Sequence, residues 1–347
     1  MSVQPTENYQ FETGVYRPPS EGGSFSLLVR FTRNCPWNRC GFCAMYKTEK
    51  FQLRPVPEIK ADIDAIAALC NALTDSDGRV CQDAAVRLIS RRPALNNHPG
   101  FAMVYHWLHA GGKTAFVQDA NSMIMPTDAL VEALGHLRHT FASIVRVTSY
   151  ARSKTIAQKS PDELVAIHQA GLDRLHVGLE SGDADLLKHI KKGVTPENHI
   201  KGGQMAMAAG FQLSEYWMPG LGGRQMWEQH ARNTALVLNQ INPHFIRSRP
   251  LNTVPGTPLC DDEAAGRLTM LTAHEQLREL KLMIQTLEVT SRVCFDHAAN
   301  YWTDRRGNLL FTHSYEGYKF PEEKPKVLER IEQGLLTDNH RPSRLLL

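Results

Sequence analysis

Residues 143–183 read SIVRVTSYARSKTIAQKSPDELVAIHQAGLDRLHVGLESGD, and this stretch contains one complete strand–helix–strand unit. The runs 143–148 and 173–179 are rich in β-branched and other apolar residues, which is typical of strands buried in a parallel sheet. Between them, Ser160-Pro161-Asp162-Glu163 forms a capping-box pattern with proline at the first helical position, which predicts a helix that runs to Ala170. Gly171 follows directly, where a helix must stop before the next strand.

The same alternation of strands and helices extends to both sides of this unit. Further strands are expected at 24–32, 113–117, 211–218 and 244–249. Amphipathic or capped helices are expected at 57–73, 82–110 (interrupted near its middle), 127–139, 195–209 and 226–239. Six strands with intervening helices predict an α/β fold with a parallel sheet that is closed or partly closed.

Length and composition exclude several classes of protein. The 347 residues include 39 Lys and Arg against 36 Asp and Glu, a near balance without the charge excess expected of a nucleic-acid binder. No apolar run approaches the roughly 18 residues of a membrane span, and the polar N-terminus is unlike a secretory signal. We therefore expect a cytoplasmic protein with no membrane partner, and a small-molecule substrate is favoured over nucleic acid.

Three of the seven cysteines, Cys35, Cys40 and Cys43, fall within nine residues. An odd number of cysteines without a secretory signal argues against a disulfide framework, and clustered thiols in a reducing compartment usually bind metal. A structural zinc site needs four ligands, and no second pair of ligands follows this one. Three thiolates on a [4Fe-4S] cluster would leave one iron open to bind something else.

A rival interpretation involves Cys70. The spacing C-x4-C-x2-C also occurs in plant-type [2Fe-2S] proteins, where a distant fourth cysteine completes the site. Cys70 lies in the helix expected at 57–73, on the same face as Ile59, Ile63 and Ile66, so it is expected in the core. This favours a three-cysteine cluster. The alternatives are a non-catalytic iron–sulfur electron-transfer protein and a zinc-stabilised RNA-binding module.

Polar segments follow several of the expected strands. The cysteine loop follows the first strand, and the segments 118–121, 149–152 and 180–182 follow later ones. The carboxyl ends of parallel strands meet at one edge of the sheet, where α/β enzymes gather their chemistry. The sequence therefore predicts a functional site at this edge.

With these features the chain resembles the radical S-adenosylmethionine (SAM) superfamily, in the branch of oxygen-independent coproporphyrinogen oxidase, MiaB, NifB and the elongator catalytic subunit. The three cysteines carry the resemblance together with Phe42, and it extends through FVQDANS (116–122), VGLESGD (177–183) and VPGTPL (254–259). The usual spacing in that superfamily is C-x3-C-x2-C, so this chain has one additional residue between its first two cysteines.

The resemblance implies an architecture and a division into domains. It implies a partial (β/α)6 TIM-like barrel at 24–260, preceded by an N-terminal arm at 1–23 and followed by a mostly helical C-terminal extension at 261–347. In that extension, Asp296, His297 and Asn300 could line a substrate pocket.

The resemblance also implies cofactors and contacts. Cys35, Cys40 and Cys43 would hold three irons of one [4Fe-4S] cluster, and SAM would chelate the fourth. Phe42 would pack near adenine, Glu180 would contact SAM, and Lys192 would lie near its carboxylate. Asp119 and Asn121 stand where the family has a Gly-Gly-Glu segment, and Tyr150 and Arg152 lie at the rim of the third strand.

The implied activity is that of an oxygen-sensitive enzyme that reductively cleaves SAM to a 5′-deoxyadenosyl radical, which abstracts hydrogen from an unidentified substrate. In such enzymes the cofactor supplies the chemistry, and the protein supplies binding and orientation. An electron donor such as flavodoxin or ferredoxin is expected as a partner.

Overall fold

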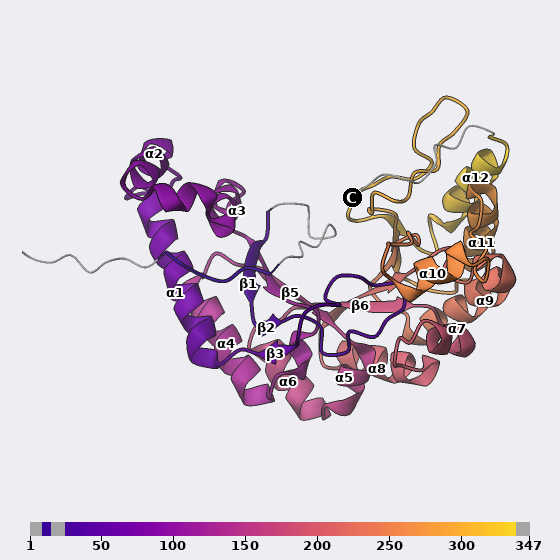
Figure 1. Ribbon diagram of the computed structural model, residues 1–347, viewed down its shortest axis with the longest axis horizontal. Helices are drawn as coiled ribbons and strands as arrows, with labels where there is room; N and C mark the ends of the chain where they lie inside the picture. Colours follow the sequence, from indigo (N-terminus) through magenta and orange to yellow (C-terminus); the bar gives the residue numbers. More distant parts are fainter. Residues whose placement is uncertain (1–8, 15–24, 338–347) are drawn as a thin grey trace, which may run out of the picture. The chain divides into compact units, whose positions relative to one another are not determined.

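The structure is a computed structural model that describes residues 9–14 and 25–337 (Figure 1). The strands are β1 (Leu27–Arg30), β2 (Thr32–Arg33), β3 (Gln52–Leu53), β4 (Thr114–Gln118), β5 (Arg146–Ala151), β6 (Arg174–Glu180), β7 (Gln212–Trp217), β8 (Phe245–Ser248), β9 (Arg292–Cys294) and β10 (Tyr318–Lys319). The α-helices are α1 (Val56–Leu73), α2 (Gln82–Arg91), α3 (Pro99–His109), α4 (Thr127–Thr140), α5 (Ser153–Gln158), α6 (Pro161–Gln169), α7 (Ala184–His189), α8 (Pro196–Ala208), α9 (Gly223–Ile241), α10 (Pro258–Ala264), α11 (Ala273–Thr286) and α12 (Lys324–Leu335).

Eight strands form one sheet in the order β1-β4-β5-β6-β7-β8-β9-β10. In this sheet the pairs β1/β4, β4/β5, β7/β8 and β8/β9 are parallel and β9/β10 is antiparallel, and β2 and β3 form a separate antiparallel pair. Each crossover therefore steps to the next strand in the chain, whereas a doubly wound sheet reverses direction at its centre. This confirms the expected α/β class and the strand order of a partial TIM-like barrel.

The capping box predicted at Ser160–Glu163 is present at the start of α6. Ser160 N–H donates to Glu163 Oε2 at 2.8 Å, and Glu163 N–H donates back to Ser160 Oγ at 3.2 Å. Two of the four amide groups that a helix leaves unsatisfied at its start are thereby paired locally. Local sequence fixes this helix start without help from tertiary contacts.

Contacts divide the described residues into two compact units. Unit 1 takes residues 9–14, 25–36, Lys50–Tyr150 and Val165–Arg174, and unit 2 takes Trp37–Glu49, Ala151–Leu164 and 175–337. One boundary thus falls within the cysteine loop. The division into arm, barrel and extension at residues 24 and 261 remains a prediction.

In unit 1, helices α2, α3 and α4 all pack against α1. Its buried face includes Ile59, Ile63 and Ile66, none more than 1% exposed, together with Cys70. Burial raises the pKa of the Cys70 thiol to about 12, so this group stays protonated at neutral pH. The expectation that Cys70 faces the core is confirmed.

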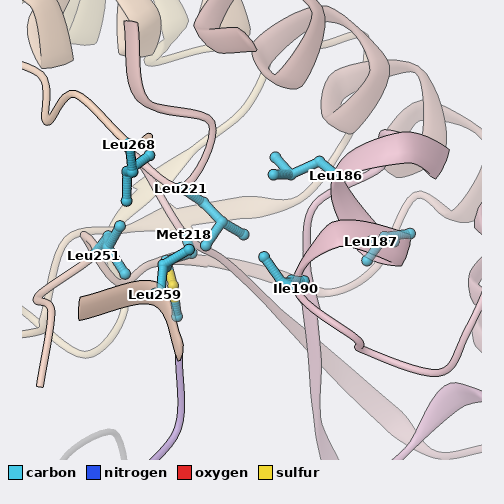
Figure 2. Packing of buried hydrophobic residues seen from close by; sticks show 8 residues of the cluster. All are labelled: Leu186, Leu187, Ile190, Met218, Leu221, Leu251, Leu259 and Leu268. Carbon is cyan, nitrogen blue, oxygen red and sulfur yellow. The ribbon is translucent and has the colours of Figure 1, made fainter. Parts of the chain in front are cut away.

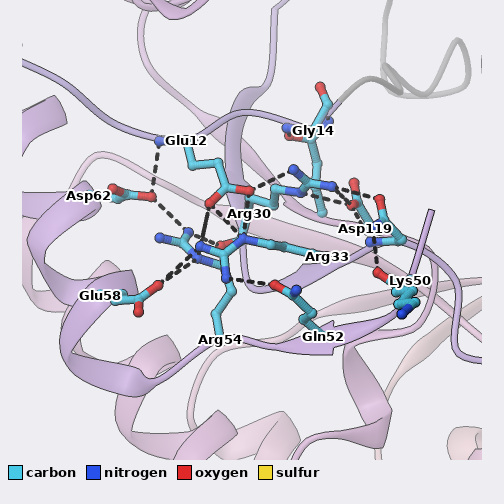
Figure 3. Close-up of polar contacts among 12 residues, drawn as sticks. Glu12, Gly14, Arg30, Arg33, Lys50, Gln52, Arg54, Glu58, Asp62 and Asp119 are labelled. Carbon is cyan, nitrogen blue, oxygen red and sulfur yellow. Dashed lines mark hydrogen bonds and ion pairs between the residues drawn. The ribbon is translucent and has the colours of Figure 1, made fainter.

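An ion-pair network joins the N-terminal segment to β1 and α1 in unit 1 (Figure 3). Glu12 accepts from Arg30 Nη1 at 2.6 Å and from Arg33 Nη2 at 2.7 Å. Arg54, whose side chain is 3% exposed, pairs with Asp62 at 2.7 Å and donates to the carbonyl of Arg30 at 2.6 Å. The opposing charges let these side chains lie partly buried at the end of β1.

In unit 2, helix α8 packs against α5 and α9, and α11 packs against α9 and α12. The approach of α8 to α5 is close: a Cβ at Gly202 would lie 2.5 Å from the Ser153 carbonyl oxygen. At this position glycine is needed for space.

An apolar cluster fills unit 2 beyond the end of β7 (Figure 2). It contains Leu186, Leu187, Ile190, Met218, Leu221, Leu251, Leu259 and Leu268, all at most 7% exposed. Its members come from α7 and the residue after it, from the glycine-rich loop after β7, from the loop after β8, and from α10 and the segment after it, and they lie up to about 80 residues apart in the sequence. Burial of this cluster therefore fixes the loops that follow β6, β7 and β8.

Helices α11 and α12 lie in the expected mostly helical C-terminal extension, and α10 crosses its predicted boundary at residue 261, but the extension also contributes to the sheet. Strand β9 adds to β8 in parallel, with Ile246 opposite Val293, and β10 pairs antiparallel with β9. The sequence analysis did not predict these two strands. They have only three and two residues, too few for a periodic pattern to be visible.

Candidate functional site

The centre of the site in unit 2 is a buried ion pair at the end of β6. Lys192 Nζ lies 2.8 Å from Glu180 Oε1, and both side chains are 10% exposed. Glu180 is the last residue of β6 and has φ +61°, in the left-handed region that residues other than glycine seldom adopt. Strained backbone of this kind is concentrated at functional sites.

Space for this pair comes from Gly178, two residues earlier on β6. A Cβ at Gly178 would lie 2.2 Å from Glu180 Oε1 and 2.9 Å from Lys192 Nζ. On its other side, Lys192 Nζ lies 5.8 Å from the centre of the Phe42 ring, within reach of a cation–π interaction. The structure thus brings together Phe42, Glu180 and Lys192, three residues that the sequence analysis selected.

Arg152, which follows β5, extends this group. Its Nη2 donates to the Lys192 carbonyl at 2.6 Å, and its guanidinium lies 5.2 Å from the centre of the Trp37 ring. Trp37 Nε1 donates to the Lys191 carbonyl at 2.7 Å, and a Cβ at Gly193 would lie 2.2 Å from the Trp37 ring. Trp37 therefore fastens the loop between the first two cysteines to residues 191–193.

The second half of the cysteine loop is fastened at Gly41. Gly41 N–H donates to the Ile190 carbonyl at 2.8 Å, and its own carbonyl accepts from Leu259 N–H at 3.0 Å. Lys47 Nζ donates to the Cys40 carbonyl at 2.9 Å, and Phe42 packs on the apolar cluster of Figure 2. The backbone around Cys40 is thereby tied to the same segment that carries Lys192.

Of the three motif cysteines, Cys40 is buried, whereas Cys35 and Cys43 are half-buried. Cys35 belongs to unit 1, and the other two belong to unit 2. Among residues 9–14 and 25–337, no group of three or more Cys, His, Asp or Glu side chains is placed to hold a metal ion. The three-cysteine ligand set therefore stays a prediction.

The other three predicted contacts lie in unit 1. Asp119 Oδ2 accepts from Arg30 Nε at 2.8 Å, from Arg30 Nη2 at 2.5 Å and from Asn34 N–H at 2.8 Å (Figure 3). Asn121 is buried just before a short 3-10 turn, and the Tyr150 ring lies edge-on to Phe116 at 5.0 Å. Asp119 thus already has a structural partner in Arg30.

Sequence reasoning missed Glu215, which lies within β7. It is 0% exposed, and neither carboxylate oxygen accepts a hydrogen bond from the described residues. Burial raises the pKa of Glu215 well above its usual range; the Lys192 charge opposes this rise and the Glu180 charge adds to it. The signal was available: a glutamate interrupts the otherwise apolar run LSEYWM.

His199, in the first turn of α8, was missed as well. It is fully buried, and its Nδ1 lies 2.5 Å from Ser153 Oγ. Burial lowers the pKa of His199 well below its usual range, and the nearby charges of Lys192 and Arg152 lower it further. At neutral pH the imidazole is therefore uncharged, which limits the positive charge at this end of β6.

Comparisons with known proteins found similarity only among solved structures. No family model matches the chain, and no curated protein matches it. The archaeal Methanocaldococcus infernus Elp3 with residues 1–46 deleted is 15% identical, with a TM-score of 0.47 over 67% of this chain and 57% of that chain. The radical S-adenosylmethionine methyltransferase TsrM from Kitasatospora setae is 14% identical, with a TM-score of 0.46 over 67% of this chain and 38% of that chain.

Methylornithine synthase (PylB) is 13% identical, with a TM-score of 0.44 over 78% of this chain and 67% of that chain. The structures similar to this chain thus include radical SAM enzymes, the superfamily that its sequence motifs resemble. This chain spans 57% and 38% of the length of the first two.

Proposed function

We propose that this protein is a radical SAM enzyme with one [4Fe-4S] cluster bound by Cys35, Cys40 and Cys43. The observation that supports it best lies in unit 2: the loop bearing Cys40 and Cys43 is tied to the segment that carries Lys192, beside the Glu180 carboxylate. A thiol-rich loop and a buried polar group thus adjoin each other at the end of a parallel strand, where α/β folds bind ligands.

The residues present fit an iron–sulfur cluster by their chemistry. Three thiols lie within nine residues, and none of the seven cysteines is in a disulfide. Cys43 N–H approaches the Cys40 carbonyl at 3.4 Å, which describes a turn that brings the two residues together. Cys70 is buried in α1 with a protonated thiol, which makes it a poor fourth ligand.

When bound, the cluster would supply the electron that cleaves SAM and so generates a 5′-deoxyadenosyl radical. This chain's own residues would bind and orient SAM. Glu180 would accept a charge-assisted hydrogen bond from a cationic group of SAM. Lys192 and Arg152 would pair with the SAM carboxylate, and Phe42 would pack against the SAM adenine. From unit 1, Asp119, Asn121 and Tyr150 are the proposed contacts.

The substrate is proposed to be a small molecule from which hydrogen is abstracted. The enzyme is proposed to be cytoplasmic and oxygen-sensitive, with flavodoxin or ferredoxin as electron donor. Among the described helices, none combines the length and the apolar character needed to cross a bilayer.

Metal analysis and EPR of anaerobically reconstituted protein test this proposal. We expect about four irons per chain and an EPR signal of the reduced protein that changes when SAM is added. About two irons and no response to SAM would instead identify an electron carrier. Bound zinc without iron would identify a zinc-stabilised module.

A further inference from the structure

The backbone at Glu180, in unit 2, forms a tight turn that hydrogen bonds hold on both sides. Ser181 N–H donates to the Leu179 carbonyl at 2.8 Å, which closes a three-residue turn with Glu180 at its centre. With φ +61° at the central residue, this is the rare and strained form of the turn. The Glu180 carbonyl accepts from Met218 N–H at 3.0 Å, just beyond the end of β7. Strained backbone of this kind persists only where the surrounding structure holds it.

One buried imidazole contacts both segments that hold this turn. His230 lies in α9 and is 0% exposed. Its Nε2 lies 3.1 Å from the Met218 carbonyl oxygen, and its Nδ1 lies 2.9 Å from Ser181 Oγ. The Met218 side chain belongs to the apolar cluster of Figure 2, so its backbone is a fixed point in the core. His230 therefore ties the residue that follows Glu180 to this fixed point.

The hydrogen bonds decide which ring nitrogen of His230 carries the proton. A carbonyl oxygen can only accept, so Nε2 carries the proton and donates to Met218. Nδ1 then accepts from the Ser181 hydroxyl, and the Thr234 hydroxyl lies 3.3 Å from the same nitrogen. Burial lowers the pKa of His230 to about 4, so the ring is neutral at pH 7 and keeps this arrangement. Both ring nitrogens thus bond to the protein, and His230 is not placed to touch a ligand itself.

Other residues of α9 hold the segment that follows the turn. Gly182 N–H donates to Thr234 Oγ1 at 2.9 Å, and a Cβ at Gly182 would lie 2.3 Å from the Asn233 carbonyl oxygen. Asn233 Nδ2 donates to Asp183 Oδ2 at 2.7 Å, and Asp183 is the N-cap of α7. The segment after Glu180 therefore lies directly on α9, and α9 sets its position.

We propose that His230 is a positioning residue that holds the Glu180 carboxylate in the orientation that binds SAM. A left-handed residue directs its side chain differently from an extended one, so the turn decides where the carboxylate points. With the turn in place, the carboxylate lies 2.8 Å from Lys192 Nζ. Without the imidazole, we expect Glu180 to relax to a negative φ, which residues other than glycine favour by about tenfold. That the ligand is SAM rests on the proposed function, whereas the hold on Glu180 does not.

His230→Phe tests the role of the imidazole, because it keeps an aromatic ring and removes both hydrogen bonds. SAM binding should weaken about tenfold, since the apparent affinity falls with the fraction of molecules whose Glu180 is in place. Anaerobic calorimetry on reconstituted protein measures the change. In a Glu180→Gln background the same substitution should have little further effect, as expected of a residue that acts through Glu180. The control is Leu238→Ala, about two turns further along α9, which loses buried packing but should bind SAM normally.

Amide hydrogen exchange of the same proteins without SAM reports on the turn directly. In His230→Phe, exchange at Ser181 and Met218 should become about tenfold faster, because relaxation of Glu180 opens both of their hydrogen bonds. The amides of α12, which lie outside these contacts, should keep their wild-type rates. Ser181→Ala removes only the hydroxyl and should change exchange at Met218 in the same direction by less. It replaces His230→Phe if that variant does not fold.

Two results would overturn the positioning role: an unchanged SAM affinity in folded His230→Phe, or an equal loss of affinity in both backgrounds. Unchanged exchange at Ser181 and Met218 would refute the hold on Glu180. If the wild type itself binds no SAM, the proposed function fails, and the exchange rates still decide whether His230 holds the turn. A negative exchange result together with normal SAM binding by the wild type would leave the proposed function standing.

Discussion

Glu180 combines three unfavourable features: a buried carboxylate, a left-handed backbone and dependence on glycine at position 178. Its pairing with Lys192 offsets the charge burial, but a pair of apolar residues of similar volume would often be at least as stable. Strain and charge burial at one residue favour the ligand-binding role that we propose for Glu180.

Glu180→Gln should weaken SAM binding about tenfold or more while leaving the iron content unchanged. The amide keeps the shape and still accepts from Lys192 Nζ, but it loses the charge: a hydrogen bond to a charged group is worth roughly 1.5–3 kcal/mol, against roughly 0.5–1.5 kcal/mol for a neutral one. Anaerobic calorimetry of SAM binding measures the change, with the exposed Asp185→Asn as the matched control. An unchanged affinity for SAM would show that Glu180 has a structural role only.

Glu279 in α11 should make the protein less stable as the pH rises. It is fully buried, Gly220 N–H donates to its Oε2 at 2.6 Å, and burial raises its pKa to about 8. The folded state therefore holds a proton that the unfolded state releases above its lower pKa. The free energy of unfolding is highest below that unfolded pKa and falls until the pH passes about 8.

Urea unfolding of Glu279→Gln between pH 6.5 and 8 checks this expectation. His230, whose pKa burial lowers to about 4 in the folded state, still titrates in the unfolded state near its ordinary pKa of about 6.5, but this contribution is common to the wild type and the variant and cancels in the comparison. The wild-type slope should exceed that of the variant by up to about 1.4 kcal/mol per pH unit, the value for one proton. Glu288→Gln, on the surface, should leave the slope unchanged, and equal slopes for all three proteins would refute the assignment.

At the scale of the element, the cysteine loop and helix α1 present their thiols differently. Cys40 lies in a loop anchored by Trp37 and Gly41, whereas Cys70 is one residue of an apolar helix face. The loop holds its thiols outside regular structure, where they are available as ligands, and the helix buries its thiol in the core.

Cys40→Ala should lose most iron after reconstitution, whereas Cys70→Ala should retain it. Each motif cysteine is proposed to hold a different iron, and the Cys70 thiol contributes only packing. Iron and sulfide analysis of both variants, with circular dichroism to show that each is folded, measures the difference. Loss of the cluster from a folded Cys70→Ala protein would favour the plant-type electron carrier.

The close packing of α8 on α5 requires that residue 202 is a glycine, without a Cβ. Gly202→Ala should destabilise the protein by roughly 1–3 kcal/mol, because the new Cβ meets the Ser153 carbonyl at 2.5 Å. Gly135→Ala is the matched control: this helical glycine of α4 is exposed, and its Cβ would meet nothing within 4 Å. The control should gain about 0.5–1 kcal/mol from helix propensity. Equal effects of the two substitutions would contradict the packing argument.

At the scale of the whole molecule, the proposed function predicts slow SAM cleavage without any substrate. Reduced, reconstituted protein plus SAM should form 5′-deoxyadenosine and methionine, because an open iron can deliver an electron to bound SAM. Chromatography of the quenched mixture quantifies both products, with Cys40→Ala under the same reductant as control. Equal amounts of 5′-deoxyadenosine from both proteins would refute the radical SAM assignment.

The sequence by itself determined the order of elements and the chemistry of the loop. Alternating apolar runs and capped helices predicted the parallel sheet, because burial of a strand and satisfaction of a helix end leave local patterns. The same reasoning placed Cys70 in the core. The resemblance carried by the sequence motifs selected Phe42, Arg152, Glu180 and Lys192, which lie together in unit 2.

Only the tertiary structure decided what those residues contact. The left-handed φ of Glu180, the space left by Gly178 and the ion pair of Asp119 with Arg30 arise between segments distant in the chain, and no local pattern encodes them. The same holds for β9 and β10, which exist because β8 offers an edge to pair with. Local sequence determines which backbone conformations are low in free energy, whereas long-range packing determines which charged groups are buried together.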